Sequence, residues 1–509
     1  MNKIGFNNFR RYLNFEPLEF GGITFLTGRN NSGKSTLVKA LLLIDAYFKS
    51  GRPHSFSFGN SVLEDANIVT FGRAKNYSSS ADWISFTFQI LEFYVEMSVY
   101  GVDDQTVGVV DSLLIIDTKN NLNYHFNMGG GEIHISKTNL LKDENEGEQQ
   151  QLTELEKEIL ELADTLKTST LKKSSREYIT MVEDLRAVEN KRDLLLNKET
   201  ESDIQYSFTI EVDKNKGLKE IVEFTTLMAS IYHDREFTEI QGGAQESKYF
   251  ADYRAVAQDQ KLIEERFSDF YSLIHDWHSI VYLPANPAKQ SALFQIRDTN
   301  NALAQSIHIY YQLKMQVGEP AYVFIEKWMK EFEIGDSFEI IIHGGEAYEV
   351  KIKSGDSIVQ LADKGMGSIQ AMLLIFRLAV ILYQTLDTDD ILTIIIEEPE
   401  LNLHPALQSK LADLFLEIYE KCHHDFVIET HSEYILRRSQ VIVAEKEFEI
   451  TPNHNPFKAY YFPVDPKQSP YSLAYREDGS FDKNFGDGFF DEASSSTLEL
   501  LKLKRQKKA

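Results

Sequence analysis

The stretch GRNNSGKST, Gly28–Thr36, constrains the fold of this chain more than any other feature, because it fits the phosphate-loop pattern G-x-x-x-x-G-K-[ST]. Such a loop needs a buried strand before it and a helix after it. ITFL, residues 23–26, is typical of a short buried strand, and apolar residues at helical spacing follow the loop. These residues are Leu37, Ala40, Leu41 and Ile44. The alternative is a surface glycine turn before an ordinary helix.

The residue types of the loop match what a nucleotide phosphate requires. Gly28 and Gly33 let the backbone wrap around an anion without a Cβ clash. Main-chain N–H groups of the loop and of the helix N-terminus point at the phosphate. Lys34 can reach the β- and γ-phosphates, and the Ser35 hydroxyl can bind Mg²⁺. The predicted nucleotide-binding residues are Gly28, Arg29, Asn30, Asn31, Ser32, Gly33, Lys34, Ser35 and Thr36.

Composition narrows the class of protein. The chain has 509 residues, 42% of them hydrophobic, which suffices for more than one structural unit. Its formal net charge of −25 opposes nucleic-acid binding over the whole surface but leaves a local basic patch open. Cys422 is the single cysteine, so no intrachain disulfide can form. The N-terminus does not resemble a signal peptide, and we expect no apolar run long enough to span a bilayer. We predict a cytoplasmic protein without a membrane partner.

Changes in composition along the chain predict four regions. Residues 1–137 are the N-terminal part of an α/β head, with the phosphate loop and an antiparallel β lobe. Residues 138–202 are a coiled-coil hairpin insertion, 203–450 the C-terminal part of the head, and 451–509 a small C-terminal region. We therefore predict an α/β fold in which a mixed sheet carries the phosphate loop, with the antiparallel lobe beside it and a helical hairpin projecting from that lobe.

The insertion shows apolar residues at alternating spacings of three and four, which is typical of a coiled-coil seam. The first such residues are Leu152, Leu155, Ile159, Leu162 and Leu166. After the polar stretch KTSTLKKSS a similar seam resumes, so two helices joined by a turn are expected. Either this hairpin is a solvated insertion, or it is an arm for self-association or partner docking.

The stretch TIIIEEPELNLHP supplies the acidic partner that a phosphate loop needs. Residues 393–396 fit a central parallel strand, and Glu397 and Glu398 follow at its C-terminal end, where α/β folds bind ligands. One acid would hold Mg²⁺ through water and the other would orient the attacking water as a general base. Adjacent strand residues point apart, so we predict the metal for Glu397 and the base for Glu398. The alternative is an acid pair that caps a helix.

Two more motifs lie in the same half of the chain. In HDFVIETHS, His431 follows a second apolar strand and can hydrogen-bond the γ-phosphate or the attacking water; the alternative is a core histidine. In LADKGMGSIQAML, Gly365 and Gly367 precede Ser368 and a long apolar helix. Glycines at a helix N-terminus form an anion nest, which we expect to close on the γ-phosphate of a second subunit. The alternative is a structural N-cap by Ser368.

The order of these motifs resembles the ABC-type AAA ATPases related to SMC proteins and to the OLD (overcoming lysogenization defect) proteins, and NNFRRYLNF is similar to their NFR opening. Gly28–Thr36 match the Walker A motif, and Asp363–Ser368 match the signature, which adds Asp363 to the predicted nucleotide contacts. Glu397 and Glu398 match the Walker B acids, and His431 matches the switch histidine. The resemblance implies ATP and Mg²⁺ as cofactors and a head-to-tail homo-oligomer with shared ATP sites.

The chain also departs from that family. Glu397 stands in place of the usual aspartate, and VYLPANPAKQ lacks the arginine that relatives often carry there. Too few residues follow His431 for the TOPRIM nuclease domain of OLD proteins. The layout resembles bacterial ATPases of anti-phage defence operons, among them that of the phage anti-restriction-induced system. It implies an ATPase that gates a separate effector, a nuclease or toxin.

Three alternatives to this function stay open. One is a scaffold that assembles with ATP and barely turns it over. The second is a DNA-repair ATPase of the SMC type, for which DNA would be a partner. The third is a nuclease, but the sequence offers no second acidic cluster with metal-ligand spacing, and the adjacent side chains of KCHHD point apart.

Overall fold

The computed structural model describes residues 2–59, 62–63, 66–138, 204–213, 216–240, 248–274, 280–285, 291–298, 301–388, 390–446, 455–486, 489–490, 496–497 and 499–500. The chain divides into two compact units. The larger unit comprises Met1–Leu91, Glu96–Asp111 and Asp269–Ala509, and the smaller comprises Glu92–Val95 and Ser112–Ser268. The predicted coiled-coil seam, from Leu152 onward, lies outside the described residues.

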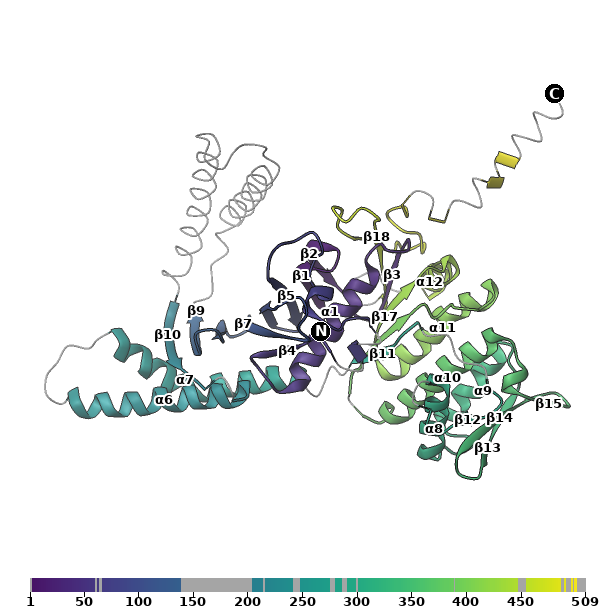
Figure 1. Ribbon diagram of the computed structural model, residues 1–509, viewed down its shortest axis with the longest axis horizontal. Helices are drawn as coiled ribbons and strands as arrows, with labels where there is room; N and C mark the ends of the chain where they lie inside the picture. Colours follow the sequence, from purple (N-terminus) through teal and green to yellow (C-terminus); the bar gives the residue numbers. More distant parts are fainter. Residues whose placement is uncertain are drawn as a thin grey trace. The chain divides into compact units, whose positions relative to one another are not determined.

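A mostly parallel sheet of six strands carries the phosphate loop in the larger unit (Figure 1). Its order is β11-β16-β17-β3-β18-β19, and all neighbours are parallel except β19, which is antiparallel to β18. The strands are β3 (Ile23–Gly28), β11 (Ile280–Leu283), β16 (Thr393–Glu397), β17 (Asp425–Thr430), β18 (Phe457–Phe462) and β19 (Tyr471–Ser472). Every residue of β3 is buried, which matches a central strand covered on both faces. The predicted strands at residues 23–26 and 393–396, and the apolar strand predicted before His431, are confirmed.

Strand β18 comes from far along the chain and borders the strand of the phosphate loop. It pairs with β3 from Phe457 opposite Ile23 to Phe462 opposite Gly28. Gly22, with a φ of 60°, permits this approach, because a Cβ there would meet the carbonyl oxygen of Pro456. Residues of the C-terminal region thus complete the sheet that holds the loop.

Helix α1 (Lys34–Ser50) starts directly after the loop, as predicted, and its N-cap Gly33 is in the left-handed region. Leu37, Ala40, Leu41 and Ile44 are all fully buried, so the apolar spacing does mark the core face of the helix. Gly51 ends the helix with a φ of 64°.

The larger unit also contains antiparallel strands and further helices. The antiparallel strand β1 pairs with β2 and with β5, and the hairpin of β13 and β14 turns at Gly344 and Gly345. The strands are β1 (Lys3–Phe9), β2 (Tyr12–Glu19), β4 (Ser55–Ser57), β5 (Trp83–Ile90), β12 (Phe294–Gln295), β13 (Ser337–His343), β14 (Ala347–Ser354) and β15 (Ser357–Gln360). The helices are α3 (Phe71–Ala74), α8 (Ala302–Leu313), α9 (Pro320–Glu331), α10 (Met366–Thr385), α11 (Pro405–Cys422) and α12 (Glu433–Lys446), with the 3₁₀ turn η2 (Leu361–Asp363).

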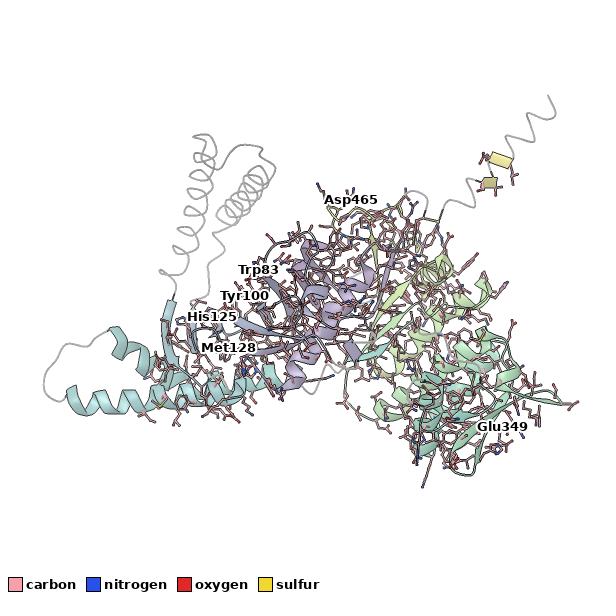
Figure 2. All side chains as sticks on the ribbon, in the orientation of Figure 1. Trp83, Tyr100, His125, Met128, Glu349 and Asp465 are labelled. Atoms are coloured by element: carbon pink, nitrogen blue, oxygen red, sulfur yellow. The ribbon has the colours of Figure 1, made fainter. Side chains whose placement is uncertain are left out.

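The smaller unit is an antiparallel sheet with two long helices. Strands β7 to β10 pair in chain order, and β6 and β7 have residues in both units. The elements are β6 (Phe93–Tyr100), β7 (Val107–Asp117), β8 (Leu122–Asn127), β9 (Glu132–Thr138), β10 (Ile204–Glu211), α6 (Leu218–Ile240) and α7 (Lys248–Ser272). Asp117 and Glu92 both accept hydrogen bonds from Arg266 of α7, at 2.6 Å each. His125, labelled on β8 in Figure 2, shares a hydrogen bond of 2.9 Å with Ser112. The expected antiparallel β lobe is confirmed.

One expectation about apolar runs was wrong. Helix α10, at 20 residues and a mean hydropathy of 1.8, is long and apolar enough to cross a membrane. Its most apolar window is 72% buried, because the helix lies in the core between α8, α9 and α11. Burial of most of its residues explains why this helix is so apolar.

Candidate functional site

The phosphate loop has the backbone that a glycine-rich anion cradle requires. Gly28, Asn31 and Gly33 have φ values of 151°, 60° and 99°. A Cβ on Gly28 would lie 2.5 Å from the carbonyl oxygen of Phe462, and one on Gly33 would overlap the ring of Tyr12. Both glycines are therefore required by crowding as well as by φ. The hydroxyl of Ser32 is buried and has no partner among the described residues, as expected for a group that awaits a ligand.

Lys34 lies at the centre of the site and is only 2% exposed. Its Nζ donates to the carbonyl oxygens of Gly28, at 3.1 Å, and Arg29, at 3.2 Å, and lies 3.7 Å from Oε1 of Glu429. Burial lowers the pKa of Lys34, which the nearby carboxylate of Glu429 partly opposes. These contacts hold the ammonium group against the loop, where a bound phosphate would meet it.

Glu429, at the end of β17, meets the first turn of α1. The Ser35 hydroxyl donates to its Oε1 at 2.9 Å, and its Oε2 is buried without a partner among the described residues. Burial raises the pKa of Glu429 to about 7, although the Lys34 ammonium opposes the rise. Glu397 is the register partner of Glu429 on β16, so both carboxylates leave the same edge of the sheet.

These oxygen donors fit Mg²⁺. A hard dication prefers carboxylate and hydroxyl oxygens, and it would relieve the cost of the buried, unpartnered oxygen of Glu429. Ser35 and Glu429 lie together in the structure, whereas Glu397 is hydrogen-bonded to Tyr282, and burial raises its pKa. Metal binding by Ser35 and Glu397 stays a prediction. The contact between Ser35 and Glu429 makes Glu429 a further candidate ligand.

Glu398 is oriented by a turn rather than by strand alternation. Its φ is 46°, and its N–H donates to the carbonyl oxygen of Glu429 at 2.8 Å, just past the end of β16. Its Oε1 lies 3.9 Å from Nε2 of His431, and its side chain is 35% exposed. The argument that neighbouring strand residues point apart therefore does not apply to this residue. The acid pair also caps no helix, because α11 begins at Pro405 with His404 as its N-cap.

His431 is held at this edge by a second buried acid. Its N–H donates to Oε1 of Glu400 at 2.6 Å, and Oε2 of Glu400 is another buried oxygen without a partner in the described part of the chain. Burial, with the Lys34 charge, lowers the pKa of His431 to about 4, so the ring is neutral at pH 7. A neutral imidazole can donate one hydrogen bond and accept another.

A cavity of about 400 Å³ opens over the loop. It lies within the size range of small-molecule sites. One wall is residues 31–36 with Glu429, and the remaining lining is rich in cations. The cationic residues other than Lys34 are Arg10, Arg11, Lys39, Arg73 and Lys75. Burial and the neighbouring Arg73 lower the pKa of Arg10, and burial and Arg10 lower that of Lys39. Mutually repelling cations in a chain of net charge −25 point to a polyanionic ligand.

The signature lies apart from this cavity. Helix α10 begins at Met366 with Gly365 as N-cap, so Ser368 is inside the helix and the alternative of an N-cap by Ser368 is wrong. A Cβ on Gly367 would lie 2.6 Å from the carbonyl oxygen of Asn402, which requires glycine there. Gly365 faces open space. None of the residues 363–368 is among the described residues that line the loop cavity.

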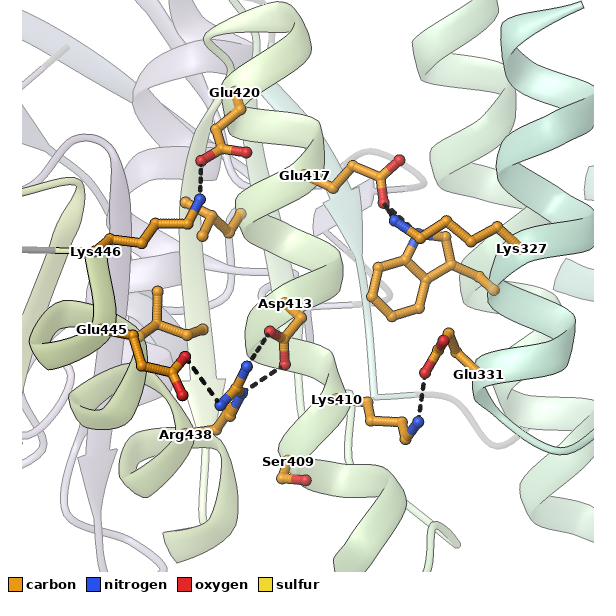
Figure 3. Close-up of a pocket in the computed structure, with 13 residues that line it drawn as sticks. Lys327, Glu331, Ser409, Lys410, Asp413, Glu417, Glu420, Arg438, Glu445 and Lys446 are labelled. Atoms are coloured by element: carbon orange, nitrogen blue, oxygen red, sulfur yellow. Dashed lines mark hydrogen bonds and ion pairs between the residues drawn. The ribbon is translucent and has the colours of Figure 1, made fainter.

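A second cavity, of about 640 Å³, lies between α9, α11 and α12 (Figure 3). Its charged side chains are paired with one another across the helices. The pairs are Lys327 with Glu417, Lys410 with Glu331, Arg438 with Asp413 and Glu445, and Lys446 with Glu420. These pairs leave no excess of positive charge to attract a phosphate, in contrast to the cavity over the loop.

Fold and site together define a phosphate-loop nucleotide-binding protein of the α/β class. The family described as AAA ATPase domain matches residues 1–436, and the chain belongs to that family. This confirms the AAA ATPase inferred from the motif order. A comparison with curated proteins gives no significant match.

Solved structures similar to this chain include the Smc head domain of Pyrococcus furiosus bound to the C-terminal domain of ScpA, with 10% identity and a TM-score of 0.37 over 98% of this chain and 99% of that one. The SMC head domain of Thermotoga maritima aligns with 9% identity and a TM-score of 0.33 over 93% and 98%. The recombination mediator RecF aligns with 10% identity and a TM-score of 0.30 over 93% and 98%. Scores this low carry no conclusion about activity.

The sequence pattern does not identify several residues of the site. It predicts no role for Glu429, although ETHS places this residue beside His431 in the chain, and none for Glu400 within TIIIEEPELNLHP. Arg10 and Arg73 come from separate segments that only the fold brings to one cavity. The sole signal available for Arg10 was its place in the NFR-like opening.

Proposed function

We propose that this ATPase hydrolyses ATP in a head-to-tail dimer. The phosphate loop of one chain and the signature of the other would form each site. The observation that carries the proposal is the placement of Asp363–Ser368. This segment ends in a helix N-terminus that has no side-chain cap, Gly365 faces open space, and none of its residues is among the described residues that line the cavity over its own loop. The signature segment of a second chain can therefore complete that cavity.

Within the site, the charge and position of each residue suggest a separate role for it. Lys34 and the loop N–H groups would hold the β- and γ-phosphates in place. Ser35 and Glu429, with Glu397 beside them, would hold Mg²⁺, which when bound supplies positive charge against the phosphate oxygens. Glu398 would accept a proton from the attacking water, since its carboxylate is partly exposed and lies 3.9 Å from Nε2 of His431. The neutral His431 would orient that water or the γ-phosphate.

The Ser368→Arg variant tests the dimer. The long charged side chain would block the approach of the α10 N-terminus to a second chain and leave the chain's own cavity intact. We expect near-normal ATP affinity by calorimetry, loss of ATP-dependent association by light scattering, and loss of most turnover. Full turnover by Ser368→Arg would end the composite-site proposal. The matched control is Ser409→Arg, because Ser409 lies on α11 away from the loop cavity.

We further propose that closure and opening of the dimer gate a separate effector protein, a nuclease or toxin, in anti-phage defence. The support is the resemblance in motif order and layout to defence ATPases. A scaffold with little turnover predicts an ATP-dependent change in mass without phosphate release. A DNA-binding ATPase of the SMC type predicts binding to duplex DNA that weakens steeply with salt. Measurement of phosphate release, mass and DNA binding on one preparation separates the three.

A further inference from the structure

Arg11 joins three segments that are far apart in the chain. It lies in the turn between β1 and β2, and its guanidinium donates one hydrogen bond to the carbonyl oxygen of Asn31 in the phosphate loop. A second hydrogen bond goes to the carbonyl oxygen of Val464, two residues after the end of β18. Because the guanidinium is a planar fork of fixed geometry, one side chain holds both carbonyl groups at a fixed spacing.

On the loop side, Arg11 packs against backbone that has little room to move. Asn31 has a φ of 60°, and the carbonyl oxygen of the next residue, Ser32, accepts a hydrogen bond from the Tyr12 hydroxyl at 2.9 Å. The guanidinium of Arg11 lies 5.4 Å from the centre of the Tyr12 ring, so these two neighbours pack together against the loop. A Cβ on Gly33 would lie 2.5 Å from Cδ of Arg11. A shift of the loop therefore requires a shift of Arg11.

On the other side, Arg11 holds the start of a hydrogen-bonded turn. Asp465, labelled in Figure 2, follows Val464, and its side chain and carbonyl oxygen accept hydrogen bonds from the N–H groups two and three residues later, at 3.0 and 3.1 Å. This turn leads from β18 into β19, where the hydroxyl of Tyr471 donates to the carbonyl oxygen of Asn484 at 3.0 Å. A displacement of Val464 is thereby passed on to the turn and to β19.

Both carbonyl contacts of Arg11 are costly to lose. Its Nε is buried and has no partner within the described part of the chain. The two contacts to Asn31 and Val464 are therefore the hydrogen bonds that compensate the partial desolvation of the guanidinium. Hydrogen bonds from a charged donor are about twice as strong as neutral ones, so the side chain follows both carbonyl groups rather than releasing one.

We infer that Arg11 couples nucleotide binding at the phosphate loop to the turn between β18 and β19. This inference rests on the proposed ATP site and adds a means of regulating it. A bound nucleotide that fixes the loop also fixes Val464 through Arg11. Because such coupling is reciprocal, a protein that displaces the turn lowers the affinity of the loop for ATP by the same factor. Arg11 is in this role a positioning residue.

The test follows amide hydrogen exchange by mass spectrometry, with and without saturating Mg·ATP. Peptides that cover the loop, residues 463–473 and, as a reference, α9 are compared. In the wild type, we expect ATP to slow exchange in the loop and, by about fivefold or more, in residues 463–473. In Arg11→Met the loop should still respond, whereas residues 463–473 should not. The affinity of this variant for ATP should fall by about 3- to 10-fold, because Asn31 is held less firmly.

Two further variants separate the bridge from charge and from general stability. Arg11→Lys keeps the charge but lacks the fork, so we expect ATP affinity within about threefold of the wild type and no response of residues 463–473. The matched control is Lys458→Met. Lys458 of β18 also contacts β2, because its Nζ donates to Oε1 of Glu19 at 2.6 Å, but it lies opposite Thr24, far from the loop end of β3. This variant should respond to ATP as the wild type does.

The outcomes distinguish the coupling from the ATP site. If the wild-type loop is protected but residues 463–473 do not respond, or if they still respond in Arg11→Met or Arg11→Lys, the coupling through the fork is overturned and the ATP site stands. Loss of the response in Lys458→Met also overturns it, because any contact between β2 and β18 would then suffice. If Mg·ATP does not protect the wild-type loop, the proposed ATP site fails and the coupling fails with it.

Discussion

Replacement of Gly28 by alanine should damage both stability and nucleotide binding. At a φ of 151° any side chain is strained, by about 1–3 kcal/mol. The new Cβ would also lie 2.5 Å from the carbonyl oxygen of Phe462 and 2.8 Å from Oγ of Ser32, so β18 or the loop must move. We expect a total cost of about 2–4 kcal/mol in unfolding free energy. Movement of the loop should weaken Mg·ATP binding by about tenfold or more.

The matched control is Gly51→Ala. Gly51 also has a positive φ, of 64°, but a Cβ there would meet no atom within 4 Å. This change should cost about 1 kcal/mol and leave ATP affinity unaltered. Urea unfolding midpoints and calorimetry on both variants provide the comparison. Wild-type ATP affinity in Gly28→Ala, or equal losses in the two variants, would refute the claim that crowding at β18 shapes the phosphate loop.

Three further predictions concern single side chains. Lys34→Ala should lower ATP affinity by about tenfold or more, because one charge-assisted contact to phosphate is lost; tight binding by calorimetry would contradict the loop site. Glu398→Gln should bind ATP, stay in the closed dimer and lose turnover; phosphate release near the wild-type rate would transfer the base role to another acid. Burial lowers the pKa of His424 to about 4 from its ordinary 6.5. The contribution of the neutral His424 to the free energy of unfolding is therefore complete above pH 6.5 and is lost as the pH falls toward 4. That loss amounts to about 3 kcal/mol, and urea titrations at several pH values should show it in the wild type and in the control His423→Asn but not in His424→Gln.

The sequence predicted those parts of the site that depend on local pattern. Gly28–Thr36 lies between a buried strand and a helix because short-range periodicity and glycine chemistry determine that unit. The strand that ends at Glu397 and the apolar helix that contains Ser368 follow from the same kind of pattern.

Features that depend on pairing over long distances were not predictable from pattern. The alignment of β18 with β3 joins residues more than four hundred positions apart, and no local signal in FKAYYF specifies its neighbour. Likewise the left-handed φ of Glu398 places its carboxylate where strand alternation does not. The contact of Ser35 with Glu429 exists because β17 lies next to β3, which only the sheet order establishes.

The most direct test of the composite site mixes two inactive variants. In a mixed dimer of Lys34→Ala and Ser368→Arg, both lesions fall in one site and the other site is whole. Steady-state phosphate release is measured for each variant alone and for the equimolar mixture, with subunit exchange followed by energy transfer between labelled chains. The shared-site account predicts near-zero release from each variant and a clear return of release on mixing, to at most about half the wild-type rate per chain. Release that stays at the unmixed level although exchange is demonstrated would contradict it.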